Sequence, residues 1–392
     1  MIGTTSCPVV HRGPAAWARQ PLIWGVACFL AVQITSIGIL EWKMPEFFDP
    51  KYGCRLNKLR SIVSAEPGLK VAIILGSSRA EQGFRPSLLV PARCLGGRNL
   101  KVTRSCSPAP AHFPVSHTSL VPDPISSFPA PSMPLLYNFA RGGSSPLLHL
   151  LTLKRLLADG IHPEWIFLEI FPPSLVDDQT ETTLAKTTVR DFGLVGGHPV
   201  NWLTYAYFVR DRLLLWTRYR TGLLATLDAA CIPRGNRWET LWNPRTGEWQ
   251  VIGKSISPEQ LLEEAADARR RYQKKLCDLK IAPGADRATR AILELSRQHD
   301  IRMILFMMPE SSEFRSWYTP ASGKRISDYL SAICSRYDLP LIDARTWIAD
   351  EDFWDGHHLL LHGAMVFMQR FSTDVLSRIM PKDFETSLCE PR

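Results

Sequence analysis

A stretch of twenty residues without a charged side chain, from Pro21 to Leu40, constrains this 392-residue chain more than any other feature. A helix rises about 1.5 Å per residue, so this length matches a hydrocarbon core of roughly 30 Å. Two arginines lie within the ten residues before the stretch, and acidic residues predominate just after it. From the positive-inside bias we predict a cytoplasmic segment at 1–20, a transmembrane signal-anchor helix at 21–41, and an extracytoplasmic remainder.

Two other interpretations of this stretch stay open. A cleaved signal peptide also has an apolar core, but this stretch is longer than a usual one and lacks a small-x-small site after it. A lipoprotein signal ending at Cys28 would carry a leucine where Gly25 stands. We therefore expect an uncleaved anchor and a single-pass membrane protein.

The composition limits the partners of the chain. The net charge is +8 and the pI is near 9.1, but the basic residues form no dense run. Arg269–Arg271 comes nearest, and it alternates with acidic residues in a segment of helical character, which is typical of a solvated helix face. The nine cysteines show no Cys-x-x-Cys and no Cys/His spacing that suits zinc. We expect no nucleic-acid partner, no disulfide framework and no cofactor.

Short apolar runs alternate with helix-like segments through the rest of the chain. The runs are Val71–Leu75, Leu135–Phe139, Trp165–Ile170, Ile301–Met308 and Pro340–Ile342. The helix-like segments are Pro146–Asp159, Arg325–Tyr337 and Gly363–Ile379. Continuous apolar strands that alternate with helices indicate a parallel sheet covered on both faces. We predict an α/β domain, a three-layer α/β/α sandwich with about five parallel strands, over residues 70–176 and 300–385.

Three segments stand outside this alternation. Residues 42–69 have the polar character of a juxtamembrane connector with a short helix. Residues 91–132 hold eight prolines and seven serines, which indicates a flexible insert. Residues 177–299 are rich in aromatic side chains and in helical spacing, and we predict a helical insertion or cap there. Its aromatics could line a sugar or lipid site, or could only pack the added helices.

Two serines open a turn directly after the first apolar run, at Gly76-Ser77-Ser78. The carboxyl ends of strands in open parallel sheets are where ligands bind. The glycine permits a sharp turn, and the following segment can start a helix whose N–H groups face a developing oxyanion. The same pattern also fits two serines that only cap a helix. A serine acts as a nucleophile only with a neighbouring base, so the turn alone does not establish catalysis.

An aspartate and a histidine lie three residues apart near the C-terminus. Asp355 and His358 can share one side of a loop turn, so that the carboxylate orients the ring while the other ring nitrogen faces Ser78. A metal site of Asp355, His358 and His362 is the alternative. Because Gly363 is expected to start the next helix, the two histidines would not share a helical face, and we expect no metal.

Together these motifs resemble the SGNH (GDSL-like) hydrolase superfamily, whose members carry Ser, Gly, Asn and Asp-x-x-His in separate blocks. Gly76–Ser78 resembles the first block, with Ser78 at the nucleophile position. Asn138–Gly143 resembles the second block, with Gly143 as a backbone oxyanion donor. Asp355–Leu359, followed by Gly-Ala, resembles the last block. The resemblance implies a flavodoxin-like sandwich, and it covers residues 70–90, 133–175 and 300–380.

The third block departs from the family pattern. Where the family has Gly-x-Asn-Asp after a strand, this chain has Leu168–Pro173. The missing asparagine is an oxyanion donor, and the loss of one such donor costs on the order of 100-fold in rate. An ionised Glu169 only accepts hydrogen bonds, so an arginine is the expected replacement. The expected oxyanion and substrate-binding residues are Gly143, Ser77, Arg79, Asn138 and Arg141.

The resemblance implies a function outside the membrane. The departure is shared with a membrane-anchored branch that resembles the alginate O-acetylation proteins and the D-alanyl-lipoteichoic acid transfer protein. We therefore predict a serine esterase or O-acyltransferase that acts on acyl esters of a cell-surface glycan or similar polymer. Ser78 would be the nucleophile, with Ser77 as the less favoured choice, His358 the base and Asp355 its orienter. The alternative is a catalytically inactive scaffold that binds polysaccharide or partners in a cell-envelope assembly.

Overall fold

A computed structural model describes residues 14–43, 49–89, 134–178, 183, 187–188, 190–191, 194, 202–213, 243, 245–248 and 257–379. The predicted flexible insert at 91–132 lies outside these residues, as does much of the predicted cap between 214 and 256. The strands are β1 (Val71–Leu75), β2 (Leu135–Asn138), β3 (Trp165–Glu169), β4 (Arg302–Met307) and β5 (Leu341–Asp343).

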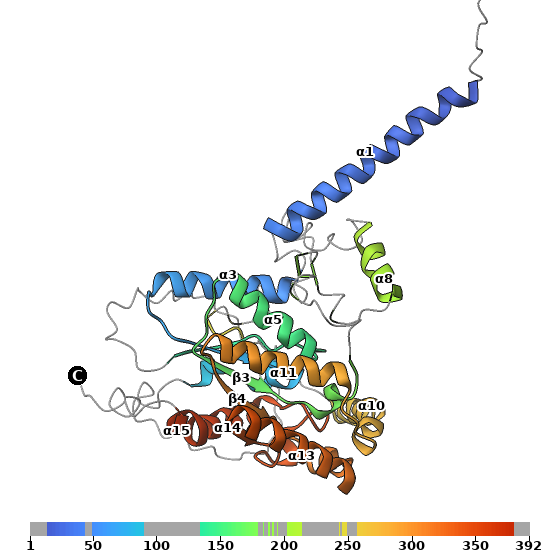
Figure 1. Cartoon of the computed structure of the whole chain (residues 1–392). Helices are drawn as coiled ribbons and strands as arrows, with labels where there is room; N and C mark the ends of the chain where they lie inside the picture. The colour runs from blue at the N-terminus through green and yellow to red at the C-terminus, as the bar shows by residue number, and fades with distance from the viewer. Residues whose placement is uncertain are drawn as a thin grey trace, which may run out of the picture.

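The helices surround this sheet, apart from α1 and α8, which lie away from it (Figure 1). They are α1 (Pro14–Lys43), α3 (Pro50–Ala65), α4 (Ser78–Gly83), α5 (Pro146–Ala158), α8 (Trp202–Leu213), α10 (Pro258–Cys277), α11 (Pro283–Gln298), α12 (Ser312–Ser316), α13 (Pro320–Tyr337), α14 (Leu361–Phe371) and α15 (Ser377–Ile379). Short turns are η1 (Pro86–Leu88), η2 (Pro172–Leu175), η6 (Asp350–Asp352) and the π-helical η7 (Ser372–Leu376).

Local sequence explains where several helices begin. Ser145, Ser257 and Thr319 cap α5, α10 and α13, and each is followed directly by a proline. The capping oxygen accepts a backbone N–H of the first turn, and proline suits the first helical position because its missing N–H would be unpaired there.

All five strands are parallel, in the order β2-β1-β3-β4-β5, so the predicted fold class is confirmed. This 2-1-3-4-5 order is the flavodoxin-like one, and the chain reverses direction across the sheet beside β1. The pairing of Leu75 with Leu168 places the residue after β1 next to Glu169, the last residue of β3. The serine turn therefore starts at the switch point, where open α/β sheets bind ligands.

Strands β1 to β4 each contribute side chains to two separate cores. In β1, Ile73 and Leu75 join the core beneath α3, α5 and α11, whereas Ala72 and Ile74 join the core beneath α4 and α14. Successive side chains of a strand point to opposite faces, so an unbroken apolar run fits a sheet that is covered on both faces. The three-layer arrangement follows from these two cores.

Two predicted boundaries need correction. Helix α11 packs on α5 and β4, and its Ala288 and Ile292 are fully buried in the main core, so the α/β unit includes this helix and does not resume at residue 300. Helix α3 is likewise part of that core through Leu56 and Leu59, although it falls inside the predicted connector. Helical spacing alone did not distinguish a layer helix from an added one.

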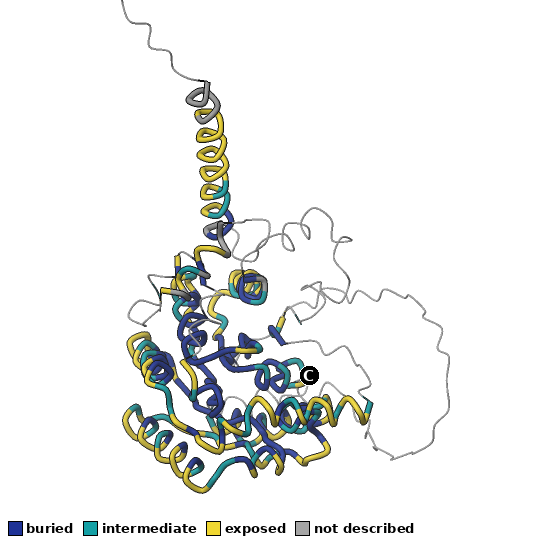
Figure 2. The backbone as a smooth tube through the Cα atoms, turned by 90° about the vertical axis from the view of Figure 1, so that its right-hand side faces the viewer, coloured by how far each residue is buried: buried dark blue, intermediate teal, exposed yellow. Residues whose placement is uncertain are grey.

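Helix α1 extends away from the α/β unit, and its length is almost entirely exposed (Figures 1 and 2). Its segment Gln20–Glu41 has 22 residues with a mean hydropathy of 2.0. The helix is therefore long and apolar enough to span a membrane. Large apolar side chains such as Leu22 and Trp24 are 70% exposed there, which fits a lipid environment better than water.

Candidate active site

The turn after β1 separates the roles of its two serines. Ser77 caps α4, and its hydroxyl accepts Arg79 N–H at 3.2 Å while donating to Glu169 Oε1 at 3.1 Å. Ser78 is the first residue of α4, and its Oγ lies 2.6 Å from His358 Nε2. Ser77 is buried and its hydroxyl is fully paired, whereas Ser78 is half-buried and faces an imidazole. The geometry thus favours Ser78 as the nucleophile.

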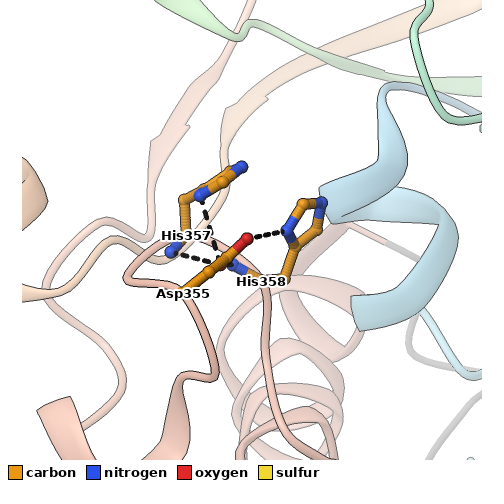
Figure 3. Close-up of side chains that lie close together, drawn as sticks. All are labelled: Asp355, His357 and His358. Atoms are coloured by element: carbon orange, nitrogen blue, oxygen red, sulfur yellow. Dashed lines mark hydrogen bonds and ion pairs between the residues drawn. The ribbon is translucent and has the colours of Figure 1, made fainter. Parts of the chain in front are cut away.

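The loop after η6 holds His358, the predicted base (Figure 3). His358 Nδ1 lies 2.6 Å from Asp355 Oδ2, while the backbone N–H groups of His357 and His358 donate to Asp355 Oδ1 at 3.1 and 2.8 Å. Gly356 has a φ of 86°, a left-handed conformation that suits glycine, and it lets the chain turn back toward the carboxylate. The loop closes through an isolated bridge between Phe353 and Leu359.

The carboxylate of Asp355 sets the tautomer of His358. An ionised carboxylate only accepts hydrogen bonds, so His358 Nδ1 carries the proton and Nε2 is left to accept the Ser78 hydroxyl. Burial by itself would raise the pKa of Asp355, but the His358 ring and the hydrogen bonds from both histidines hold that pKa well below its usual range. Asp355 is therefore ionised at neutral pH.

His357 is a second histidine beside the same carboxylate. Its ring is buried among Phe171, Phe314 and Tyr272, with ring centroids 6.1, 5.2 and 5.0 Å away. Nδ1 lies 3.1 Å from Asp355 Oδ1, but the contact lacks the alignment of a hydrogen bond and neither ring nitrogen has a hydrogen-bond partner. Burial lowers the pKa of His357 to about 4, and the adjacent His358 adds to this effect, so the ring is neutral.

The metal alternative takes a different form from the predicted one. His362 does not join Asp355, because His362 Nδ1 pairs with Asp352 at 2.7 Å and the side chain is 74% exposed. Helix α14 begins at Leu361 and not at Gly363, so His362 is helical after all. Within the described residues, Asp355, His357 and His358 are the group whose ligand atoms lie within 4.8 Å of one another.

A pair of glycines lies beside the nucleophile. A Cβ atom on Gly142 would lie 3.6 Å from Ser78 Cβ, so this turn borders the serine. Gly142 N–H donates to Glu81 Oε2 at 2.7 Å, and Gly143 has a φ of 64°. Among the hydrogen bonds of the described residues, Ser78 N–H has no acceptor. The Ser78 N–H can thus face an oxyanion, beside the turn that contains Gly142 and Gly143.

The other predicted binding residues hold the framework. Asn138 is fully buried and its Nδ2 donates to Ala80 O and Phe84 O, which ties α4 to β2. Arg141 Nη1 pairs with Asp49 at 2.7 Å, at the start of α3. Arg79 is 1% exposed, and its Nη2 donates to the backbone carbonyls at the end of β4. Within the described part of the chain, none of these three side chains makes a hydrogen bond or ion pair with Ser78 or His358.

Sequence reasoning considered Glu169 only as a residue that cannot donate to an oxyanion, and it did not single out Glu310, a second buried acid near the turn. Glu169 accepts hydrogen bonds from Ser77, and Glu310 lies 3.4 Å from Arg79 Nη1. Each acid follows or ends a buried apolar strand, at the carboxyl edge of the sheet. An acidic residue at the end of such a strand, or a few residues after it, was the available signal, because the carboxyl edge of a parallel sheet is where ligands bind.

A second serine–histidine pair offers an internal comparison. Ser144 Oγ lies 2.8 Å from His149 Nε2, but its hydroxyl donates to Gly76 O at 2.7 Å. The serine has one proton, so His149 must donate to it and cannot act as its base. Burial lowers the pKa of His149 to about 4.

No family model, curated protein or solved structure matches the chain.

Proposed function

We propose that this chain is a serine ester hydrolase or O-acyltransferase of SGNH type. The supporting observation is the continuous chain of hydrogen-bonding atoms from Ser78 Oγ through the His358 ring to Asp355, with 2.6 Å at each step. This is the arrangement that a serine needs in order to attack an acyl carbon near neutral pH.

The steps follow from the protonation states. Ser78 Oγ attacks the ester carbonyl while His358 Nε2 takes its proton, and Asp355 stabilises the imidazolium that forms. Backbone N–H groups at Ser78 and Gly143 are the proposed donors to the oxyanion. The imidazolium returns the proton to the departing alkoxide, which leaves an acyl-serine. Water then releases the acid, or a sugar hydroxyl takes the acyl group, with His358 again acting as base.

The proposed setting is the outer side of a membrane. Helix α1 is long and apolar enough to anchor the chain, and two arginines precede its apolar segment Gln20–Glu41 in the sequence. We propose acyl esters of a cell-surface glycan or similar polymer as substrates, presented to a domain that stays close to the bilayer. Partner proteins of a cell-envelope assembly would meet the α/β unit on the same side of the membrane.

Labelling with a fluorophosphonate tests the activated serine directly. The full chain in detergent is expected to form one covalent adduct, which Ser78→Ala and His358→Ala abolish and Ser77→Ala keeps. Ser144→Ala is the matched control, since it removes the serine of the other serine–histidine pair and is expected to label normally. A folded wild type that does not label would favour the scaffold, and binding to acylated polysaccharides would then be measured. If labelling succeeds, product analysis with and without a sugar acceptor separates hydrolysis from transfer.

A further inference from the structure

A buried carboxylate lies beneath the serine turn and takes no part in the proposed chemistry. Glu169 ends β3 and its side chain has no exposed surface. Oε2 accepts Ser77 N–H at 2.6 Å, and Oε1 accepts the Ser77 hydroxyl at 3.1 Å. Both oxygens act as acceptors, which is the pattern of an ionised carboxylate. The carboxylate therefore binds the residue that precedes the nucleophile at two points.

The turn approaches this carboxylate more closely than a side chain would permit. A Cβ atom on Gly76 would lie 2.6 Å from Glu169 Oε2 and 2.5 Å from Ala80 Cβ. Both distances are shorter than van der Waals contact, so glycine at this position lets the backbone rest on the carboxylate. The glycine of the turn thus serves the contact with Glu169 as well as the bend of the chain.

Arg79 provides the balancing charge. Its Nε lies 3.8 Å from Glu169 Oε1, and its Nη2 donates to Met308 O and Pro309 O at 2.8 and 2.9 Å. A buried carboxylate without a cation nearby would lower the stability of the fold by several kcal/mol, so the arginine offsets the cost of burying Glu169. Arg79 is itself part of α4, and its backbone N–H donates to the Ser77 hydroxyl. The acid, the arginine and the capping serine form one unit around the turn.

We propose that Glu169 is a positioning residue for Ser78, which acts through Ser77 and touches no substrate. Two hydrogen bonds on Ser77 fix the backbone from which Ser78 projects, and so fix the direction in which Ser78 Oγ meets His358. The inference rests on the proposed serine mechanism. It assigns a purpose to Glu169 within the segment that departs from the pattern of the resembling family: this chain uses the end of β3 to hold the nucleophile in place.

Rates and backbone order together distinguish positioning from simple packing. Glu169→Gln keeps the size of the side chain, but its amide NH2 cannot accept a hydrogen bond from Ser77. Facing the Ser77 N–H, the NH2 loses that bond; facing the Ser77 hydroxyl, it reverses the bond and leaves the hydroxyl proton without its buried acceptor. Glu169→Asp keeps the charge beside Arg79 and shortens the reach by one methylene. Glu164→Gln is the matched control, because it makes the same chemical change just before the same strand, in a side chain that is partly exposed and paired with Lys70.

The full chain would be measured in three ways: the second-order rate of fluorophosphonate labelling against pH, hydrogen exchange of residues 76–83, and thermal unfolding. We expect Glu169→Gln to label on the order of 100-fold more slowly, as for a nucleophile misplaced by about 1 Å. The midpoint of its pH profile should not move, since a positioning role alters the placement of Ser78 and leaves the groups that transfer the proton unchanged. Exchange at 76–83 should become faster, and Glu169→Asp should fall between. Glu164→Gln should match the wild type throughout.

Each other outcome is decisive. A folded Glu169→Gln that labels within about two-fold of wild type overturns the proposal, and a shifted pH midpoint shows that Glu169 acts on His358 through its charge. If Glu169→Gln does not fold, Glu169→Asp carries the same comparison. If the wild type itself does not label, the serine mechanism fails. Hydrogen exchange then still decides whether Glu169 orders the turn, because unchanged exchange in the variant contradicts that role.

Discussion

The serine turn and the histidine loop, which meet at the Ser78–His358 contact, are held in place by different kinds of interaction. The serine turn rests on buried charges, Glu169 and Arg79, with hydrogen bonds of defined direction. The histidine loop rests on aromatic rings that enclose His357, with Phe171 parallel to the imidazole. Charged contacts fix where an atom points, whereas rings exclude water and leave direction open. Direction on the histidine side comes instead from Asp355.

The two supports also touch each other. The guanidinium of Arg79 lies 4.7 Å from the centre of the Phe171 ring, and Ser311 N–H donates to Gly356 O at 2.9 Å. The same stretch after β4 therefore contacts the arginine through its carbonyls and the histidine loop through its amide. A substitution in either support should therefore also affect the other one. We make four predictions, in decreasing order of expected effect.

The largest effect is expected from Asp355→Asn. Two backbone N–H groups hold Oδ1, so the asparagine keeps its oxygen there and turns its NH2 toward His358 Nδ1. The ring then carries its proton on Nε2 and cannot accept the Ser78 hydroxyl proton. Labelling should fall roughly 10⁴-fold, the loss typical of a triad histidine in the wrong tautomer, with little change in unfolding. A loss below ten-fold would mean that Asp355 does not orient the ring.

Arg79→Met tests the charged support. It removes the cation next to Glu169 and leaves that carboxylate buried without a charged partner, so we expect a loss of about 3–5 kcal/mol in unfolding free energy. Denaturant titration measures the loss. Arg269→Met is the control, because its ion pair with Glu313 is exposed and its removal should change stability by less than about 1 kcal/mol. Equal effects of the two variants would rule out a special role for the buried pair.

His357→Phe tests the aromatic support. A phenyl ring suits the same enclosure and removes an unpaired buried imidazole, so we expect a gain of about 1–3 kcal/mol. The folded His357, with a pKa of about 4, stays neutral while the unfolded chain binds a proton below a pKa of about 6.5. Wild-type stability from this group is thus lost as pH falls from about 6.5 to 4. The advantage of the variant should be larger at pH 5 than at pH 8, and the reverse order would contradict this account.

Glu310→Gln should have the smallest effect. Burial raises the pKa of Glu310 although Arg79 opposes this, and Oε2 has no hydrogen-bond partner while Oε1 accepts from Tyr318 and Arg79. A raised pKa means that the folded state binds the proton more tightly, so stability is present at low pH and falls as pH rises through the folded pKa. The glutamine cannot titrate, and its stability relative to wild type should increase with pH. A constant difference between pH 5 and 8 would contradict a raised pKa.

Much of the fold could be predicted from the sequence, because the spacing of the apolar residues agrees with their burial in the structure. Val71–Leu75 and Trp165–Glu169 lie within the predicted runs, and their unbroken apolar character correctly indicated a doubly covered sheet. The boundary at residue 300 was wrong, because α11 has the same spacing whether it covers the sheet or an inserted unit. Helix α14 also begins two residues before the predicted Gly363.

The site was readable in part. Ser78, Asp355 and His358 could be named because a nucleophile, a base and an orienter have fixed residue types and local spacing. Arg79 and Asn138 were predicted to bind substrate, yet their side chains donate hydrogen bonds to backbone carbonyl groups of the fold. Partners of this kind are separated by up to 231 residues in sequence, so no local pattern identifies them.

The Ser78–His358 contact joins residues that are 280 positions apart. At roughly 5–20 residues per second, a ribosome makes the histidine between about 14 and 56 s after the serine. The serine and its supporting turn are therefore synthesised well before any base exists. A shortened or stalled chain that ends before β5 would carry α1 and the serine but neither Asp355 nor His358. Under the proposed mechanism, such a truncated product would therefore lack the activated serine at its place of synthesis.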